Sequence, residues 1–271
     1  RGVGEGVDVN AYTVQVQHSS RGVLEVRFHL DRDDRHEAYA YDFFAKNTFY
    51  EPEIAHLLLN TLQEGQFVID VGANIGVFTV LMACLVGPEG FVLAIEPDLG
   101  NLDKLRRNLE LNELDNVRIV PAPVWSSEEE VTFYKNADNI GGHSLWDGAL
   151  WHGNQLTQAQ RPEPSKFIAT TLDKEIRRVG RPCRLIKLDT EGADEPILSA
   201  LGDCRPDYIV SESNPFGMRQ FGHDNNTMRA LMKTYGYDCF LLSSSDDVPA
   251  MVPFNSDLCN STDDRIILNL L

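Results

Sequence analysis

The segment Val68-Ile-Asp-Val-Gly-Ala-Asn-Ile-Gly-Val-Phe78 decides the fold of this chain. Its apolar first part predicts a buried strand, its glycines predict a tight turn, and the apolar run from residue 77 onward predicts a helix. A strand, a turn and a helix N-terminus in this order place backbone N–H groups at the carboxyl edge of a sheet, where open α/β sheets bind their ligands. The segment therefore predicts a ligand-binding turn.

The glycine spacing in this turn excludes two kinds of phosphate site. A dinucleotide fingerprint that begins at Gly72 needs glycines at positions 74 and 77, where the chain has Asn74 and Val77. The G-x-x-x-x-G-K-[ST] pattern of a P-loop is absent as well. Asp70, at the end of the predicted strand, would repel a pyrophosphate and attract an ammonium or sulfonium group.

The flanking sequence alternates between helical and strand patterns. Residues 53–120 alternate three times, which predicts an α/β fold with a doubly wound, mostly parallel sheet and helices on its faces. Further strands are expected at residues 166–170, 184–188 and 207–211. Residues 237–242 and 265–270 fit a terminal antiparallel pair.

The chain is expected to have two parts. Residues 1–47 carry period-2 runs around a polar turn, which predicts an N-terminal β-rich extension with a hairpin. Residues 48–271 are expected to form the main domain. Within it, residues 136–165 hold glycines and prolines without a clear period, and such a stretch is typical of a lid-like insertion.

The composition limits the partners and the location. The chain of 271 residues has 24 basic and 41 acidic side chains and a net charge of −17, which opposes binding to nucleic acid. Its five cysteines form no CxxC pair and indicate reduced thiols in a cytoplasmic protein. No apolar run reaches the ~20 residues of a membrane span, and no secretory leader is visible. The chain does not begin with Met, so it could be part of a longer polypeptide; a homo-oligomer stays open.

A second acid follows the next predicted strand. Glu96 lies 26 residues after Asp70, close to the offset of ~20 residues at which an acid reaches ribose hydroxyls in nucleotide-binding folds. Together, Asp70 and Glu96 indicate a nucleoside that has a cationic tail and no phosphates. S-adenosylmethionine has these features, and we expect it to be the cofactor.

The chain resembles the FkbM family of class I S-adenosylmethionine-dependent methyltransferases. The matching motifs are Tyr50-Glu-Pro-Glu, Asp70-Val-Gly-Ala-Asn-Ile-Gly, Glu96-Pro, the helix with Asn108 and Asn112, Thr171-Leu-Asp, Ile186-Lys-Leu-Asp-Thr-Glu-Gly-Ala, Glu212 and Gly236-Tyr237. The resemblance covers residues 48–242 and implies a Rossmann-like sheet. It implies that the cofactor is bound by Tyr50, Glu51, Asp70, Gly72, Asn74, Gly76, Glu96 and Asp98. The family motif commonly ends in Glu-Gly-Ala-Glu, whereas here Asp194 takes the last position and Glu195 follows.

Acids also follow two later strands, with Asp189 and Glu191 after one and Glu212 with Asn214 at the end of the next. Since these strands are expected to be neighbours, Asp189, Glu212 and Asn214 could converge. Their oxygens would suit Mg²⁺, Mn²⁺ or Ca²⁺ as a metal site. Two alternatives stay open: the acids bind substrate or act as a base without metal, or they form a structural ion pair with Lys187 or a nearby arginine.

Methyl transfer to a hydroxyl also needs a group that takes the proton. Asp189, Glu212 and His143 are the candidate catalytic residues, with His143 as general base in the irregular segment. His152 and His223 are weaker candidates. The aromatic side chains that could line an acceptor pocket are Trp146, Trp151 and Phe216.

We expect an O-methyltransferase that acts on a small-molecule acceptor such as a sugar or polyketide hydroxyl, in natural product biosynthesis. An alternative is a regulatory, methyltransferase-like module that binds the nucleoside without turnover. The missing second and third glycines disfavour a nucleotide-dependent oxidoreductase.

Overall fold

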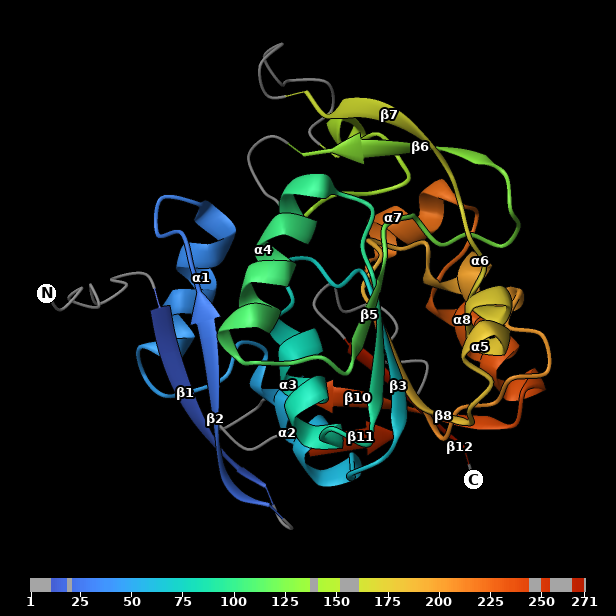
Figure 1. The fold of residues 1–271 in the computed structure, drawn as a ribbon. Helices are drawn as coiled ribbons and strands as arrows, with labels where there is room; N and C mark the ends of the chain where they lie inside the picture. Colours follow the sequence, from blue (N-terminus) through green and yellow to red (C-terminus); the bar gives the residue numbers. More distant parts are fainter. Residues whose placement is uncertain are drawn as a thin grey trace, which may run out of the picture.

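The computed structural model describes residues 11–18, 21–136, 141–151, 161–243, 250–253 and 265–270. Within them an eight-stranded sheet runs in the order β11-β10-β12-β9-β8-β3-β4-β5 (Figure 1). Five of its strands are parallel: β3 (Phe67–Val71), β4 (Phe91–Ile95), β5 (Val117–Val120), β8 (Cys183–Leu188) and β9 (Tyr208–Glu212). The predicted α/β fold with a mostly parallel sheet is confirmed.

The C-terminal strands close one side of this sheet. β12 (Arg265–Leu270) lies between β9 and β10 (Tyr237–Ser243) and is antiparallel to both. The predicted terminal antiparallel pair is therefore confirmed. The short edge strand β11 (Ala250–Pro253) pairs with β10 and was not expected from the sequence.

The order of the strands creates a crevice at one place. From β3 the chain runs outward through β4 to β5 and then returns to β8, on the other side of β3. The connections that leave β3 and β8 therefore diverge at the carboxyl ends of these two strands. Open α/β sheets bind ligands at such a reversal, because diverging loops leave space between them.

Two layers of helices cover the sheet. One face carries α2 (Pro52–Thr61), α3 (Val77–Val86) and α4 (Leu99–Leu111), and the other carries α5 (Leu172–Val179), α6 (Asp194–Ser199) and α8 (Asn225–Thr234) (Figure 1). Alternate residues of a strand point to opposite faces. Accordingly, Val68 packs into the core beneath α3, while Phe67 and Ile69 pack into the other core.

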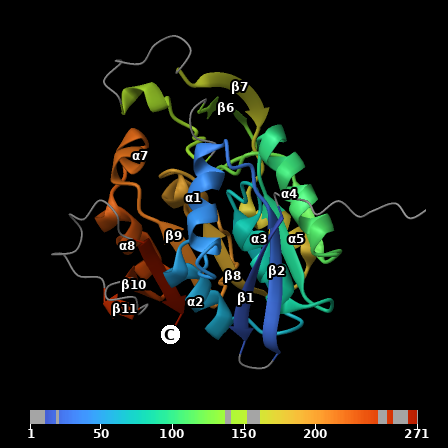
Figure 2. The ribbon, with the colours of Figure 1, turned by 90° about the vertical axis from the view of Figure 1, so that its left-hand side faces the viewer.

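The N-terminal extension is a hairpin followed by a helix. β1 (Ala11–His18) and β2 (Gly22–His29) pair antiparallel, as the sequence predicted. The helix α1 (Arg35–Phe44) was not predicted, because its many aromatic residues have weak helix propensity. Buried hairpin residues such as Val14 and Phe28 share one hydrophobic core with α3 and α4. Figure 2 views the molecule from the side of this extension.

The strands on either side of the irregular segment lie apart from the main sheet (Figure 1). β6 (Glu130–Lys135) and β7 (Glu163–Ile168) form a separate two-stranded sheet, so the strand expected near residue 166 does not join the main sheet. Between them the structure describes residues 141–151, with the short 3-10 helix η1 (Gly148–Leu150). The helix α7 (Pro215–Gln220) follows β9. No helix in the described ranges is long and apolar enough to cross a membrane.

Candidate active site

The turn after β3 is held in a conformation that few side chains tolerate. Gly72, Asn74 and Gly76 have φ angles of 75°, 51° and 90°, in the left-handed region that favours glycine and asparagine. A Cβ atom on Gly72 would lie 2.0 Å from the backbone oxygen of Asp189. The turn of β3 and the end of β8 therefore approach each other as closely as their backbones permit.

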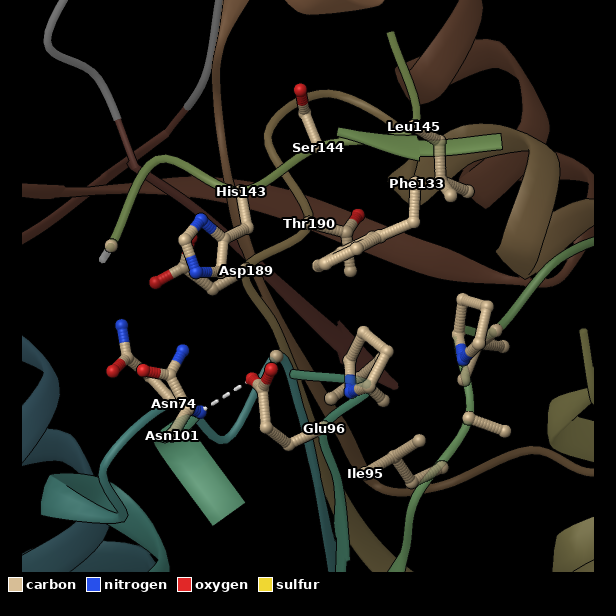
Figure 3. Close-up of a pocket in the computed structure, with 17 residues that line it drawn as sticks. Asn74, Ile95, Glu96, Asn101, Phe133, His143, Ser144, Leu145, Asp189 and Thr190 are labelled. Carbon is tan, nitrogen blue, oxygen red and sulfur yellow. Dashed lines mark hydrogen bonds between the residues drawn. The ribbon is translucent and has the colours of Figure 1, made fainter. Parts of the chain in front are cut away.

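One cavity opens beside this turn; we call it the Glu96 cavity. It encloses about 590 Å³, including its open mouth. Its polar lining includes Asn74, Glu96, Asn101, His143 and Asp189, whose side chains surround the space in Figure 3. The apolar lining consists of Val71, Ile95, Pro97, Ala122, Pro123, Val124, Phe133 and Leu145.

Glu96 is the buried acid of this cavity, with 4% of its surface exposed. Its carboxylate accepts hydrogen bonds from the backbone N–H of Asn74, at 2.9 Å, and of Asp98, at 2.8 Å. Burial raises the pKa of Glu96 to about 7, although these two hydrogen bonds act in the opposite direction. The sequence prediction that Glu96 lies at the ligand edge of the sheet agrees with this position.

Asp98, two residues after Glu96, binds groups of the protein beside the cavity. Its side chain caps the N-terminus of α4 through the backbone N–H of Asn101, and its other oxygen lies 2.6 Å from the Nζ of Lys135. Burial alone would raise the pKa of Asp98, but Lys135 and the helix amide lower it below its ordinary value. The carboxylate is thus engaged in a helix cap and an ion pair beside the Glu96 cavity.

A second cavity adjoins the first; we call it the Lys187 cavity. It encloses about 640 Å³, including its open mouth, and its charged lining consists of Asp70, Lys187, Asp189, Glu191 and Glu212. Tyr50 and Phe78 supply aromatic walls. Gly72, Asn74, Gly141 and Asp189 line both cavities, so the two spaces meet at the turn after β3.

A buried ammonium group holds the acids of the Lys187 cavity together. The Nζ atom of Lys187 lies 3.6 Å from Oδ1 of Asp70 and 3.5 Å from Oδ2 of Asp189. Burial alone would lower the pKa of Lys187, but the carboxylates of Asp189, Asp70, Glu51 and Glu212 raise it above its ordinary value. The group therefore stays protonated and supplies the positive charge that these acids need.

Other residues near Asp70 bind its side chain, add charge near Lys187 or allow the helices to pack closely. The hydroxyl of Thr79 donates to Oδ2 of Asp70 at 2.6 Å. Glu51 precedes α2 in a left-handed conformation, within electrostatic reach of Lys187. A Cβ atom on Gly76 would lie 2.3 Å from the side chain of Leu105, so this glycine lets α4 pack against the start of α3. Of the predicted cofactor residues, Tyr50, Asp70, Gly72 and Asn74 line the Lys187 cavity.

The predicted metal site is not supported. Oδ1 of Asn214 accepts from the backbone N–H of Gly217 as the N-cap of α7, and its Nδ2 donates to Glu191 at 2.5 Å. In the parts of the chain that the structure describes, no group of three or more His, Cys, Asp or Glu side chains could hold a metal ion. The Nζ atom of Lys187 lies beside Asp189, and Asn214 serves as a helix cap, so these contacts lend no support to a metal site formed by Asp189, Glu212 and Asn214, which stays a prediction.

His143 lines the Glu96 cavity rather than the Lys187 cavity. Its Nδ1 atom accepts from the backbone N–H of Asn136 at 3.1 Å. In a neutral ring this hydrogen bond assigns the proton to Nε2, which makes that atom a donor. The predicted role of His143 as a general base therefore requires a different tautomer from the one that this contact favours.

The other histidines and the aromatic residues take up separate positions. The Nδ1 atom of His223 lies 2.9 Å from a carboxylate oxygen of Glu195, and His152 lies outside the described residues. The rings of Trp146 and Trp151 both contact Phe216. The three side chains therefore pack together, but none of them lines the Glu96 or the Lys187 cavity, so their role in an acceptor pocket stays a prediction. The indole N–H of Trp146 donates to the backbone oxygen of Glu191 at 2.8 Å.

A further buried acid explains the changed motif after β8. The side chain of Asp194, at the start of α6, accepts from the hydroxyl of Ser211 at 2.5 Å and from that of Thr190. Burial raises the pKa of Asp194 to about 6. Asp194 thus binds hydroxyl groups beneath the site, and Glu195 contacts Thr227 and His223 instead.

Some lining residues were missed at the sequence level. Phe133, Leu145 and Thr190 were not singled out as lining residues, because their approach to the cavity depends on how β6 and the loops pack over the main sheet. Lys187 did give one: a lysine in the apolar run Leu185–Leu188 has to find a carboxylate when the strand is buried.

The fold and the joined cavities define an α/β protein whose cavities lie at the carboxyl ends of the parallel strands, where the strand order reverses. The family model described as the methyltransferase FkbM domain matches residues 70–239. The chain therefore belongs to the FkbM family of S-adenosylmethionine-dependent methyltransferases, and the resemblance seen in the sequence is confirmed.

Two curated relatives carry methyltransferase names. "Methyltransferase 1" of Beauveria bassiana (strain ARSEF 2860) is 26% identical over 160 residues, which cover 54% of this chain and 62% of that protein. "Methyltransferase sdnD" of Sordaria araneosa is 26% identical over 209 residues, which cover 65% of this chain and 75% of that protein. The chain thus spans less than two thirds of the length of the first relative.

Solved structures with a similar arrangement of elements are distant in sequence. A SAM-dependent O-methyltransferase from Thermotoga maritima has a TM-score of 0.45 and 10% identity, with 96% of this chain and 78% of that chain covered. Fibrillarin from Aeropyrum pernix, solved with natively bound S-adenosyl-L-methionine, has a TM-score of 0.41 and 11% identity, with 78% and 68% covered.

Proposed function

We propose that this protein transfers a methyl group from S-adenosylmethionine to a hydroxyl oxygen of a small-molecule acceptor. One observation carries the proposal: Asp189 lines both the Glu96 cavity and the Lys187 cavity. A carboxylate in this position can reach an acceptor hydroxyl in one space while the donor nucleoside occupies the other.

The residues of the Glu96 cavity fit the adenosine part of the donor. Glu96 is an acceptor-only group when ionised, and the two hydroxyls of a ribose are donors. The apolar side chains of Ile95, Val124 and Phe133 suit the faces of an adenine ring.

The chain's own residues then have distinct tasks. S-adenosylmethionine supplies a methyl group on a positively charged sulfur. Because this sulfur becomes neutral when the methyl group is transferred, it is a good leaving group. The protein mainly aligns the reactants, a contribution that can reach ~7–11 kcal/mol in well-oriented systems. Asp189 accepts the proton of the acceptor hydroxyl, Lys187 fixes the orientation of Asp189 at 3.5 Å, and Glu212 lines the same space.

The chemistry of the Lys187 cavity supports a hydroxylated acceptor. Its carboxylates accept hydrogen bonds and so match ligands with several hydroxyl donors, such as sugars or polyketides. The net charge of −17 disfavours a nucleic-acid acceptor. A role in natural product biosynthesis belongs to the same proposal.

Calorimetry with S-adenosylhomocysteine tests donor binding. We expect the wild-type protein to bind and Glu96→Ala to lose at least about tenfold in affinity, because a buried charge-assisted hydrogen bond is worth about 1.5–3 kcal/mol. Asp103→Ala is a matched control, since this acid is exposed on α4 and pairs with Arg106. Absence of binding by folded wild-type protein would overturn the proposal.

Turnover is measured separately, as formation of S-adenosylhomocysteine with a panel of hydroxylated acceptors. Formation of product with at least one sugar or polyketide acceptor supports the proposed enzyme. Binding without turnover across the panel would instead support the regulatory, methyltransferase-like module.

A further inference from the structure

One buried side chain connects the N-terminal hairpin to the turn that lines both cavities. Asn108, on α4, is fully buried. Its Nδ2 atom donates to the backbone oxygen of Ile75 at 2.9 Å, and its Oδ1 atom accepts from the backbone N–H of His29 at 2.7 Å. Each end of the carboxamide is thus bound to a different part of the fold.

The bond to Ile75 stabilises the binding turn directly. Ile75 precedes α3, which begins at Val77, so its carbonyl group lies outside the helix. A buried carbonyl without a donor would destabilise its segment. On the other side of the same turn, Glu96 accepts from the N–H of Asn74. Asn108 and Glu96 therefore hold two successive residues of the turn, one through its carbonyl and the other through its N–H.

The hairpin contributes the second half of this connection. Arg27 and His29 are two residues apart on β2, so their N–H groups point to the same edge of the strand. Asn108 binds the N–H of His29. Asn112, one helical turn later, binds both the N–H of Arg27 at 2.8 Å and its carbonyl oxygen at 2.6 Å. Asn108 in α4 and Asn112 at its C-cap therefore take the place of a neighbouring strand for β2.

The hairpin itself lies outside the ligand site. Its described residues, 11–18 and 21–29, are not among those that line the Glu96 or the Lys187 cavity. They also precede residues 70–239, which match the family model. Any effect of the hairpin on ligand binding must therefore be transmitted, and Asn108 offers a direct route of two hydrogen bonds.

We propose that Asn108 is a positioning residue through which the hairpin β1–β2 preorganises the turn at residues 72–76 and thereby strengthens binding of the methyl donor. The effect on the donor rests on the proposed function, whereas the effect on the turn does not. Preorganisation raises affinity because the turn does not have to be ordered when the ligand binds.

Two asparagine variants separate this role from general stabilisation of the hairpin. Asn108→Ala removes both bonds of the connection, and Asn112→Ala removes hydrogen bonds to Arg27 and to the backbone of Asn108. In calorimetry we expect Asn108→Ala to weaken S-adenosylhomocysteine binding about tenfold, equivalent to about 1.4 kcal/mol. The matched control Asn112→Ala should stay within about twofold of wild type.

Hydrogen exchange without ligand tests the same connection independently of methyl transfer. Amides of residues 72–80 should exchange faster in Asn108→Ala than in wild type, and at the wild-type rate in Asn112→Ala. Equal exchange in both variants would overturn the inference. If wild-type protein does not bind S-adenosylhomocysteine, the proposed function fails, and the exchange comparison still decides whether Asn108 holds the turn.

A third variant covers the case that Asn108→Ala does not fold. His29→Pro removes the N–H that donates to Asn108; β2 is an edge strand of its two-stranded sheet, a position where proline is tolerated. Faster exchange at residues 72–80 in this variant supports transmission from the hairpin. Unchanged exchange in folded His29→Pro protein would overturn it.

Discussion

Asp70 and Lys187 are direct neighbours on adjacent parallel strands, β3 and β8, and form a buried ion pair. Their charged atoms lie 3.6 Å apart, and their side chains are 1% and 3% exposed. The pair stands at the carboxyl ends of the two strands where the strand order reverses. The pair therefore lines the Lys187 cavity, and its ammonium group holds acids from β3 and from the end of β8 close together.

Replacement of Lys187 by methionine should destabilise the fold. The carboxylate of Asp70 would remain buried without its countercharge, and breaking a buried pair in this way costs about 3–5 kcal/mol. Urea unfolding measures the change. The double variant Asp70→Asn with Lys187→Met should recover much of the loss, because the fully buried Asp70 side chain is then neutral, whereas Asp189, the other partner of Lys187, is 29% exposed. A loss below about 1 kcal/mol in the single variant, typical of surface pairs, would contradict the buried-pair interpretation.

Alanine at Gly72 should be far more damaging than alanine at another glycine with the same backbone conformation. Gly72 and Gly65 have φ angles of 75° and 82°, but only at Gly72 would a Cβ atom meet backbone, 2.0 Å from the oxygen of Asp189. Gly65→Ala should cost only the left-handed strain of about 1–2 kcal/mol. Thermal unfolding of both variants checks this. Equal losses would show that β3 and β8 do not approach so closely.

Donor affinity should rise with pH around neutrality. Burial raises the pKa of Glu96 to about 7, so at pH 6 most of this carboxyl is protonated, and its ionised form, which accepts bonds from ribose hydroxyls, is scarce. Affinity for S-adenosylhomocysteine should therefore increase about tenfold from pH 6 to pH 8 and then level off. In Glu96→Gln this rise should disappear. A rise that persists in Glu96→Gln would assign the titration to another group.

Asp189 should be needed for turnover more than for donor binding. Asp189→Asn keeps the shape of the side chain but cannot take a proton, and loss of a general base costs about 10²–10⁴ in rate. S-adenosylhomocysteine affinity should stay near the wild-type value. Asp207→Asn is the control, because this acid precedes β9 at the opposite end of the sheet and pairs with Arg184. Full turnover in Asp189→Asn would remove Asp189 from the mechanism.

Removal of metal ions should leave turnover unchanged. The ammonium of Lys187 already lies between Asp70 and Asp189, and Asn214 uses its oxygen as a helix cap. Turnover is measured after treatment with EDTA and again after addition of Mg²⁺. A loss that Mg²⁺ restores would return the acids of the Lys187 cavity to the role of metal ligands.

Much of the fold could be predicted from local patterns. The strand Phe67–Val71, the turn and the helix Val77–Val86 follow from apolar period and glycine placement, which depend on neighbouring residues only. The helix Arg35–Phe44 could not be predicted in this way, because its stability comes from packing of aromatic side chains such as Phe44 against Phe28. The edge strand Ala250–Pro253 was missed too, since its four residues show no alternation of apolar and polar side chains and end in a proline.

The sequence by itself determined that two acids, Asp70 and Glu96, stand at strand ends beside a glycine turn, because strand ends and turns are local features. Only the tertiary structure decided what these acids contact. The pairing of Lys187 with Asp70 depends on the register between β3 and β8, and the bond from Asn108 to Ile75 depends on how α4 packs against α3. Both contacts join residues that are distant along the chain, and the local pattern of apolar and polar residues cannot predict such contacts.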